Sequence, residues 1–218
     1  AGQASGDGQY WIDPAGDDNQ FMAALRRFRR RQLARIAWRD LAGLADVETV
    51  LGELSLLADV CIRAACRRAG AALEARHGVP RGADGTPLEL VVLGMGKLGG
   101  GELNVSSDID LVFLYPEEGE TAGPRVVANR EFFDRLGRRV IAMLDDATAD
   151  GFVFRVDMRL RPYGESGPLT MSYAALENYL VTQGRAWERY AWLKARALTG
   201  VPQDEVDAIV GPFVYRKY

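Results

Sequence analysis

The chain has 218 residues, of which 48% are apolar and 26% are charged, and its formal net charge is −3. This composition is typical of a globular protein, and the negative net charge argues against a general nucleic-acid-binding function. No apolar run approaches the roughly 18 residues of a membrane-spanning helix, so we expect no membrane segment.

Two long helices are predicted in the N-terminal part of the chain. Apolar residues at helical spacing indicate a first helix over Gln20–Leu41, and Asp46 is a suitable N-cap for a second helix that ends near His77. Cys61 and Cys66 do not face each other on the second helix, because residues five apart point in different directions. We therefore expect two separate reduced thiols and neither a disulfide nor a metal site.

Arginines dominate the rest of the first predicted helix. They form either a docking surface for an acidic partner or a solvated helix face, and we prefer the solvated face. The expected buried stripe comprises Phe21, Leu25, Phe28, Ile36 and Leu41, and the expected exposed arginines are Arg26, Arg27, Arg29, Arg30, Arg31, Arg35 and Arg39.

A glycine-rich loop separates two predicted strands in the middle of the chain. Leu88–Leu93 is a short apolar run typical of a buried strand, and a second strand runs from Asp108 to Leu114. Five of the eight residues from 94 to 101 are glycines, and Lys97 lies among them. Because glycine lets backbone N–H groups approach closely, this composition is typical of a loop that binds phosphate.

The second strand opens on two aspartates. Side chains alternate along a strand, so Asp108 and Asp110 point to the same face, separated by about 7 Å of strand rise. Such carboxylates repel each other unless a cation lies between them, and Mg²⁺ prefers carboxylate oxygens completed by substrate phosphates. A solvated strand start is the alternative, and the glycine-rich loop directly before it favours the metal site.

A third carboxylate lies on a later predicted strand. The segment Phe152–Leu160 alternates clearly, with Arg155, Asp157 and Arg159 on one face and apolar residues on the other. Three carboxylates can hold two metal ions against a nucleoside phosphate for an in-line displacement. The acids were assigned to a polar face independently on the two strands, which strengthens this interpretation.

Two further helical regions complete the prediction. Asn129 is a suitable cap for a helix that runs to Ala149, and a helical region from Ser172 to Ala197 mixes basic and aromatic residues. Its core candidates are Leu176, Tyr179, Leu180 and Trp187. We therefore predict an α+β fold, in which a small mixed sheet carries the acids and long helices flank it. The expected segments are an N-terminal helical segment (1–87), a catalytic core (88–170) and an incomplete C-terminal helical segment (171–218).

Three blocks of the sequence resemble, in the same order, the bifunctional glutamine synthetase adenylyltransferase/adenylyl-removing enzyme family. They are GMGKLGGGELNVSSDIDLVF (Gly94–Phe113), FRVDMRLRPYGESGPL (Phe154–Leu169) and QGRAWERYAWLKAR (Gln183–Arg196). The resemblance implies a DNA polymerase β-like nucleotidyltransferase fold, in which Asp108, Asp110 and Asp157 are catalytic and bind Mg²⁺. It also implies that Gly96, Lys97, Leu98 and Gly99 cradle phosphate, and Ser107 is a further candidate for nucleotide binding. Arg159 and Arg161 are candidates for binding the incoming phosphate because of their charge and their proximity to the acids.

The first block, and Trp187–Tyr190 in the third, are more similar to the half of this family that removes AMP from glutamine synthetase by phosphorolysis and releases ADP. The resemblance implies that the chain is an incomplete copy of that half. The implied partners are glutamine synthetase as the protein substrate, ADP or ATP, and phosphate, with the PII signal protein and glutamine as regulators. The implied location is the cytoplasm, with no nucleic acid or membrane involved.

Two other functions compete with removal of AMP. The first is the reverse modification, in which the chain attaches AMP from ATP to glutamine synthetase. The second is a catalytically silent regulatory module that binds a nucleotide or a partner. Three clustered carboxylates argue against the second, because a purely structural site does not need them.

Overall fold

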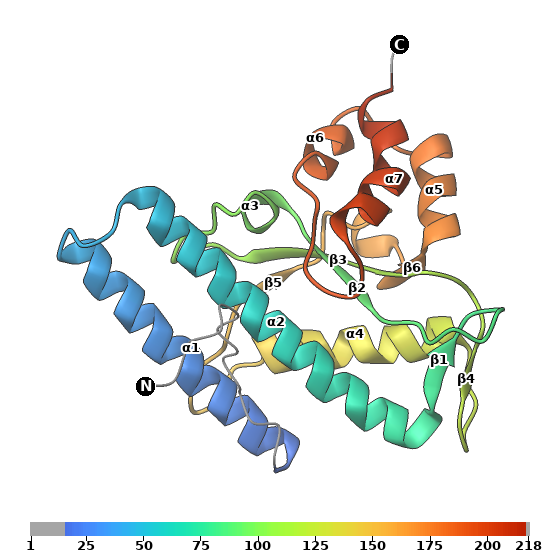
Figure 1. Ribbon diagram of the computed structural model, residues 1–218, viewed down its shortest axis with the longest axis horizontal. Helices are drawn as coiled ribbons and strands as arrows, with labels where there is room; N and C mark the ends of the chain where they lie inside the picture. The colour runs from blue at the N-terminus through green and yellow to red at the C-terminus, as the bar shows by residue number, and fades with distance from the viewer. Residues whose placement is uncertain (1–15, 217–218) are drawn as a thin grey trace, which may run out of the picture.

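A mixed β-sheet of five short strands lies between two groups of helices in the computed structural model, which describes residues 16–216 (Figure 1). The predicted α+β fold with a small mixed sheet is confirmed, and the arrangement is consistent with a nucleotidyltransferase fold. Residues 1–15 and 217–218, at the ends of the first and third predicted segments, lie outside the described residues. The division into three segments stays a prediction.

The two long N-terminal helices, α1 (Asp18–Leu41) and α2 (Val47–His77), form a hairpin and pack side by side (Figure 1). Asp46 caps α2 as predicted, because its carboxylate accepts a hydrogen bond of 2.8 Å from the N–H of Thr49. Asp17 caps α1 in the same way. The helix α2 ends at Gly78, whose φ of 80° favours glycine.

Two expectations for α1 are wrong. Leu41 lies at the end of the helix and is 87% exposed, so it does not belong to the buried stripe. Arg26 was assigned to the exposed face, but its side chain is buried and donates hydrogen bonds to the carbonyls of Met22, Met143, Asp146 and Gly151. These four carbonyl groups compensate for the loss of water around the guanidinium.

The five-stranded sheet is organised around β3 (Ile109–Tyr115), which pairs antiparallel with β2 (Val91–Gly94). The strand β7 (Arg196–Ala197) extends the sheet antiparallel to β2. On the other side of β3, β5 (Val156–Asp157) pairs with its first residues and β6 (Thr170–Ser172) with its last, both in parallel.

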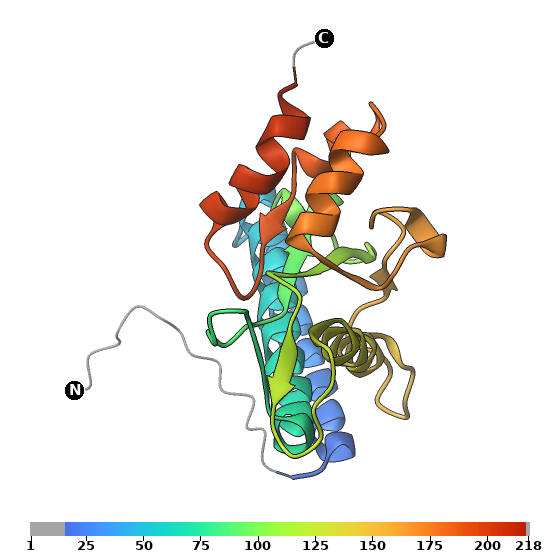
Figure 2. The ribbon, with the colours of Figure 1, turned by 90° about the vertical axis from the view of Figure 1, so that its right-hand side faces the viewer.

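Both faces of the sheet are covered, which explains the apolar runs in β2 and β3. Ile109, Leu111 and Phe113 point into the core formed with α1, α2 and α4 (Asn129–Asp145). Val112 and Leu114 point into a second core formed with α5 (Tyr173–Thr182) and α7 (Gln203–Val214). Figure 2 shows these two helix groups on opposite sides of the sheet.

A separate two-stranded sheet lies beyond the end of α2. It consists of β1 (Val79–Arg81) and β4 (Glu120–Ala122), which pair antiparallel. Asn129 was predicted to cap the following helix, but the cap position is Ala128. The Asn129 side chain instead donates hydrogen bonds to the carbonyls of Arg81 and Glu117, so it ties α4 to this small sheet.

The helix predicted from Ser172 to Ala197 is interrupted. It divides into α5, the short helix α6 (Glu188–Trp192) and the strand β7. Gly184 lies at the break, where a Cβ atom would be 2.6 Å from both the Leu180 carbonyl oxygen and the Phe213 ring. Leu176, Tyr179 and Leu180 are buried as expected, whereas Trp187 is 54% exposed.

Within residues 16–216, no helix combines the length and the apolar character that crossing a membrane requires.

Candidate active site

Two of the predicted carboxylates lie side by side where β3 and β5 pair. Asp110 is the direct partner of Asp157 in this parallel ladder, so both side chains project from the same face of the sheet. Asp110 is partly buried, and its pKa is raised by burial and by the neighbouring carboxylates of Asp157 and Asp108. The arrangement therefore concentrates negative charge at Asp110.

The two outer carboxylates are held by arginines. Arg159 donates to Asp157 through its side-chain Nε, 2.8 Å from Oδ2, and through its backbone N–H, 2.8 Å from Oδ1. These hydrogen bonds lower the pKa of Asp157. Arg155 pairs with Asp108 and also donates to the Ser106 carbonyl at 2.9 Å. Within residues 16–216, the carboxylate of Asp110 has no hydrogen-bond donor of its own.

The carboxylates of Asp108 and Asp157 are near enough to Asp110 to raise its pKa, but the three side chains are not arranged as a set of metal ligands in this structure. Among residues 16–216, no three His, Cys, Asp or Glu side chains are grouped closely enough to hold a metal ion. Two of the acids are instead neutralised by guanidinium groups. Their assignment as metal ligands therefore stays a prediction.

The glycine-rich stretch, here called the glycine turn (residues 94–101), contains one turn of α-helix, α3 (Gly96–Gly99), where a loop was expected. It lies directly against Asp110. The Met95 N–H donates to the Asp110 carbonyl at 2.9 Å, and a Cβ atom at Gly96 would be 2.7 Å from Asp110 Oδ2. Gly96 also has a φ of 53°. Both the close approach to Asp110 and this backbone conformation therefore favour glycine at position 96.

The other residues predicted to bind nucleotide on this side are placed differently. Lys97 Nζ donates to the Ser107 hydroxyl at 3.4 Å, and that hydroxyl donates to the Asn104 side chain at 2.7 Å. The Lys97 ammonium is near enough to Asp110 to counter the rise of its pKa. The Leu98 side chain is fully buried in the core, so only its backbone could contact a ligand. Gly99 is also buried, with its carbonyl bound by Arg196.

The segment that carries Asp157 is far less regular than expected. A strand was predicted over Phe152–Leu160, but only Val156 and Asp157 form one. Arg161 was predicted to bind phosphate, yet it donates to the carbonyls of Met158 and Glu165 in its own loop, at 2.8 and 3.1 Å. Arg159 is engaged with Asp157. The sequence thus placed both arginines beside the acids but did not predict their present partners.

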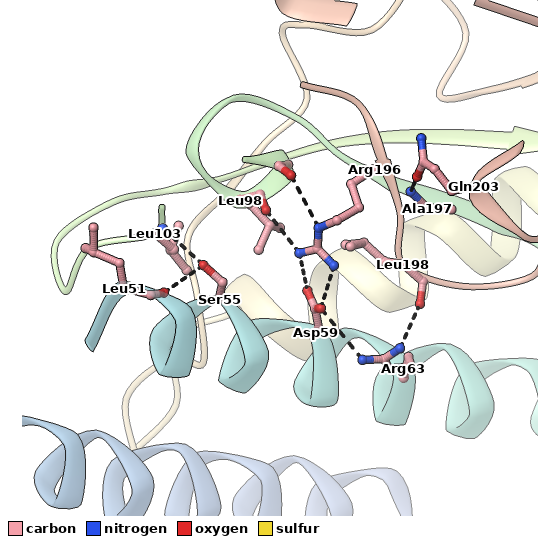
Figure 3. A network of polar contacts seen from close by, with 11 residues as sticks. Leu51, Ser55, Asp59, Arg63, Leu98, Leu103, Arg196, Ala197, Leu198 and Gln203 are labelled. Carbon is pink, nitrogen blue, oxygen red and sulfur yellow. Dashed lines mark hydrogen bonds and ion pairs between the residues drawn. The ribbon is translucent and has the colours of Figure 1, made fainter. Parts of the chain in front are cut away.

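Sequence patterns did not predict the residues on α2 and β7 that hold the glycine turn and the loop after it in place. Arg196 on β7 binds the turn and is itself held by Asp59 on α2, whereas Ser55 on α2 binds Leu103 in the loop after the turn (Figure 3). A detectable signal existed for Asp59, because it is a charged residue between the apolar neighbours Ala58 and Cys61 on a buried helix face.

Comparisons with known proteins all lead to one enzyme family. The model of the glutamate-ammonia ligase adenylyltransferase family matches residues 3–208. A bifunctional glutamine synthetase adenylyltransferase/adenylyl-removing enzyme from Chromobacterium violaceum is 59% identical over 207 residues, which cover 94% of this chain and 23% of the relative. Relatives with the same description from Nitrosomonas eutropha and Burkholderia mallei are 53% and 54% identical over 93% and 89% of this chain. The chain thus spans less than a quarter of the length of these relatives.

Proposed function

The chain belongs to the glutamate-ammonia ligase adenylyltransferase family, and on that premise we propose that it removes AMP from an adenylylated tyrosine of glutamine synthetase by phosphorolysis. In this reaction an oxygen of inorganic phosphate attacks the phosphorus of the AMP group. A new P–O–P linkage forms, the P–O bond to the tyrosine breaks, and ADP is released. The tyrosine oxygen takes up a proton, which restores unmodified glutamine synthetase.

The observation that carries this proposal is the pairing of Asp110 with Asp157 beside the glycine turn. Phosphoryl transfer needs mainly positioning and charge neutralisation, for which carboxylates that hold cations, backbone N–H groups and arginines are suited. All three kinds of group meet at this face of the sheet. In this proposal, Gly96, Lys97, Gly99, Ser107 and the Leu98 backbone hold nucleotide phosphates.

Mg²⁺ is the proposed cofactor, with Asp108, Asp110 and Asp157 as the residues that would hold it. Their chemistry fits, because Mg²⁺ prefers carboxylate oxygens, and Asp110 lies beside two further carboxylates whose exposed arginine partners can be displaced. When bound, the ion would supply neutralisation of the charge on the transferred phosphoryl group. Arg159 and Arg161 are proposed to attract the incoming phosphate, since guanidinium groups match its geometry.

The test is to incubate this chain with adenylylated glutamine synthetase, Mg²⁺ and phosphate, and to follow ADP formation together with loss of the AMP mass from the synthetase. We expect ADP release that depends on phosphate. Asp108→Ala and Asp157→Ala are each expected to lower the rate by about 10²-fold or more, because charge stabilisation at the reacting phosphorus is lost.

Asp204→Ala is the matched control, because Asp204 is an exposed carboxylate in the first turn of α7. It should keep the wild-type rate. Retained activity in Asp108→Ala and Asp157→Ala would rule out the proposed site. ATP-dependent labelling of the synthetase without phosphorolysis would instead show the attaching activity, and partner binding without turnover would show a regulatory module.

Regulation by the PII signal protein and glutamine, and a cytoplasmic location, stay predictions from the resemblance.

A further inference from the structure

The glycine turn is tied to the rest of the molecule by one arginine from the far end of the chain. Arg196 Nη2 donates to the Leu98 carbonyl at 3.0 Å, and Nε donates to the Gly99 carbonyl at 3.3 Å (Figure 3). These are the last two carbonyls of α3, and the Leu98 carbonyl also accepts a hydrogen bond of 3.2 Å from the Gly101 N–H. The guanidinium therefore completes the hydrogen bonding of the turn at its C-terminal end.

The same guanidinium is fixed on its other side by α2. Arg196 Nη1 lies 2.7 Å from Asp59 Oδ2, and Nη2 lies 3.0 Å from Asp59 Oδ1, in a two-pronged ion pair. The Asp59 side chain is only 7% exposed, whereas that of Arg196 is 34% exposed. A buried carboxylate needs such a partner, so the pair holds the arginine fork in one orientation.

A second contact from α2 fixes the chain that follows the turn. Ser55, one helical turn before Asp59 and also buried, accepts a hydrogen bond of 3.1 Å from the Leu103 N–H and donates to the Leu51 carbonyl (Figure 3). Residues four apart lie on the same helix face. One face of α2 thus contacts the glycine turn through Arg196 and the loop after it through Ser55.

Close packing explains why the turn has glycine at position 99. A Cβ atom there would overlap the Lys194 carbonyl oxygen, so only glycine lets the backbone that carries Arg196 approach the turn. The other side of the same turn contacts Asp110 through Gly96. The position of the turn relative to the carboxylates therefore depends on the contact with residues 194–196.

We propose that Arg196 is a positioning residue for the glycine turn, and that Asp59 holds Arg196 in place for this task. The polar contacts of the Arg196 guanidinium are with Asp59 and with the carbonyls of Leu98 and Gly99, and through these two carbonyls it acts on the turn. The catalytic part of this inference rests on the proposed function, because it assumes that the turn binds phosphate groups. The structural part does not depend on it.

Hydrogen–deuterium exchange tests the structural part without any turnover. The N–H groups of Gly99, Gly100, Gly101 and Glu102 each donate to a carbonyl within the turn, at 2.8 to 3.2 Å, so their exchange reports whether the turn is held. Arg196→Met should raise their exchange rates about tenfold or more, as expected for opening of a locally stabilised segment. Arg196→Lys, which keeps the charge beside Asp59 but cannot bridge two carbonyls, should raise them too.

Arg63→Met is the matched control. Arg63 lies 3.7 Å from Asp59 and donates to the Leu198 carbonyl, but it does not contact the glycine turn. It should leave the four amides unchanged. Ser55→Ala should raise exchange at Leu103 alone, because Ser55 contacts only that N–H. Unchanged exchange in both Arg196 variants, or an equal rise in Arg63→Met, overturns the proposal.

Steady-state phosphorolysis tests the catalytic part. Arg196→Lys and Arg196→Met should raise the KM for phosphate about 10- to 100-fold, the range expected when a binding group is misplaced by about 1 Å. The KM for adenylylated glutamine synthetase should stay near that of the wild type. A rise in only one of the two KM values is not produced by a general loss of folded protein. A wild-type KM for phosphate in both variants would refute the positioning role. If wild-type protein shows no phosphorolysis, the proposed function fails, and the exchange experiment still decides the structural part.

Discussion

The glycine turn and the segment from Arg155 to Arg161 both adjoin Asp110, yet they are held in opposite ways. The turn is fixed by Arg196 and the mostly buried Asp59, and it packs against the Lys194 carbonyl on one side and against the Asp110 side chain on the other. The other segment has a strand of two residues, and its acids are paired with Arg155 and Arg159, whose side chains are 56% and 71% exposed. One side of the site is therefore rigidly placed, whereas the other is held by ion pairs that water and ligands can replace.

The difference fits the chemistry that we propose. A group that must cradle phosphate benefits from a fixed backbone. Carboxylates that receive a cation need counter-ions that can leave, and exposed arginines meet this requirement at low cost in stability.

The largest effect is expected when a methyl group is added on the rigid side. Gly99→Ala places a Cβ atom against the carbonyl oxygens of Lys194 and Gly94, neither of which is the end of a flexible side chain. We expect a loss of about 3 kcal/mol or more in the free energy of unfolding, measured by urea titration.

Gly164→Ala, in the loop that directly follows the segment from Arg155 to Arg161, provides the comparison. Gly164 has a φ of 57°, and its nearest neighbour to a new Cβ atom is 3.7 Å away. Only backbone strain opposes this substitution, so the expected loss is about 1 kcal/mol. Equal losses for the two variants would contradict the distinction between a packed and an open side.

The next effect concerns Arg26, the buried anchor that lies upstream of the arginine-paired segment. Its guanidinium binds the carbonyls of Gly151 at 2.6 Å and Met143 at 3.3 Å, near the end of α4. Burial lowers its pKa, although the nearby Asp146 and Asp150 oppose the shift. Arg26→Met would leave several buried carbonyls without donors, at a cost of about 2–4 kcal/mol.

The neighbouring Arg27 is the control for this variant, because its side chain is exposed. Arg27→Met should change the free energy of unfolding by no more than about 0.5 kcal/mol. If both variants behave alike, the contacts of Arg26 do not stabilise the fold.

The smallest expected effects are on the free energy of unfolding of Asp110→Asn and Asp157→Asn, and they have opposite signs. The pKa of Asp110 is raised, so its ionised form opposes folding above the usual value of 3.8. Asp110→Asn should therefore stabilise the fold slightly near neutral pH, and it should abolish the phosphorolysis that we propose. The pKa of Asp157 is lowered by Arg159, so Asp157→Asn should destabilise the fold by up to about 1 kcal/mol.

The pH dependence of these two variants checks the assignment. The stability that Asp157 contributes is present above pH 3.8 and is lost as the pH falls through its lowered pKa. For Asp110, the difference between wild type and Asp110→Asn should shrink as the pH falls through its raised pKa. Urea titrations between pH 3 and pH 7 measure the free energy of unfolding of both variants relative to wild type. Changes of the same sign in the two variants would contradict the opposite pKa shifts of Asp110 and Asp157.

The same comparison shows what the sequence could predict. The strand β3 was predicted well because Ile109, Leu111 and Phe113 point to one core and Val112 and Leu114 to the other. Asp110 then follows from the alternation. The helices α1 and α2 were also predicted, because their caps and apolar spacing are local signals.

The sequence failed where a distant contact decides the local structure. The alternating segment from Phe152 suggested a long strand, but Val153 and Phe154 are both buried and both donate to the Leu144 carbonyl at the end of α4. Their backbone is thereby withdrawn from the sheet. The helical turn α3 was missed because its carbonyls are bound by Arg196, which lies about a hundred positions later and leaves no mark on the local pattern.

The position of Arg196 in the chain has a consequence during synthesis. Leu98 and Arg196 are separated by 98 residues, and at roughly 5–20 residues per second a ribosome adds them about 5 to 20 seconds apart. From the addition of Asp157 until that of Arg196, 39 residues later, a nascent chain carries the three aspartates and the glycine turn without the arginine that fixes the turn. In that interval the emerging polypeptide has the chemical groups of the site without the geometry that joins them.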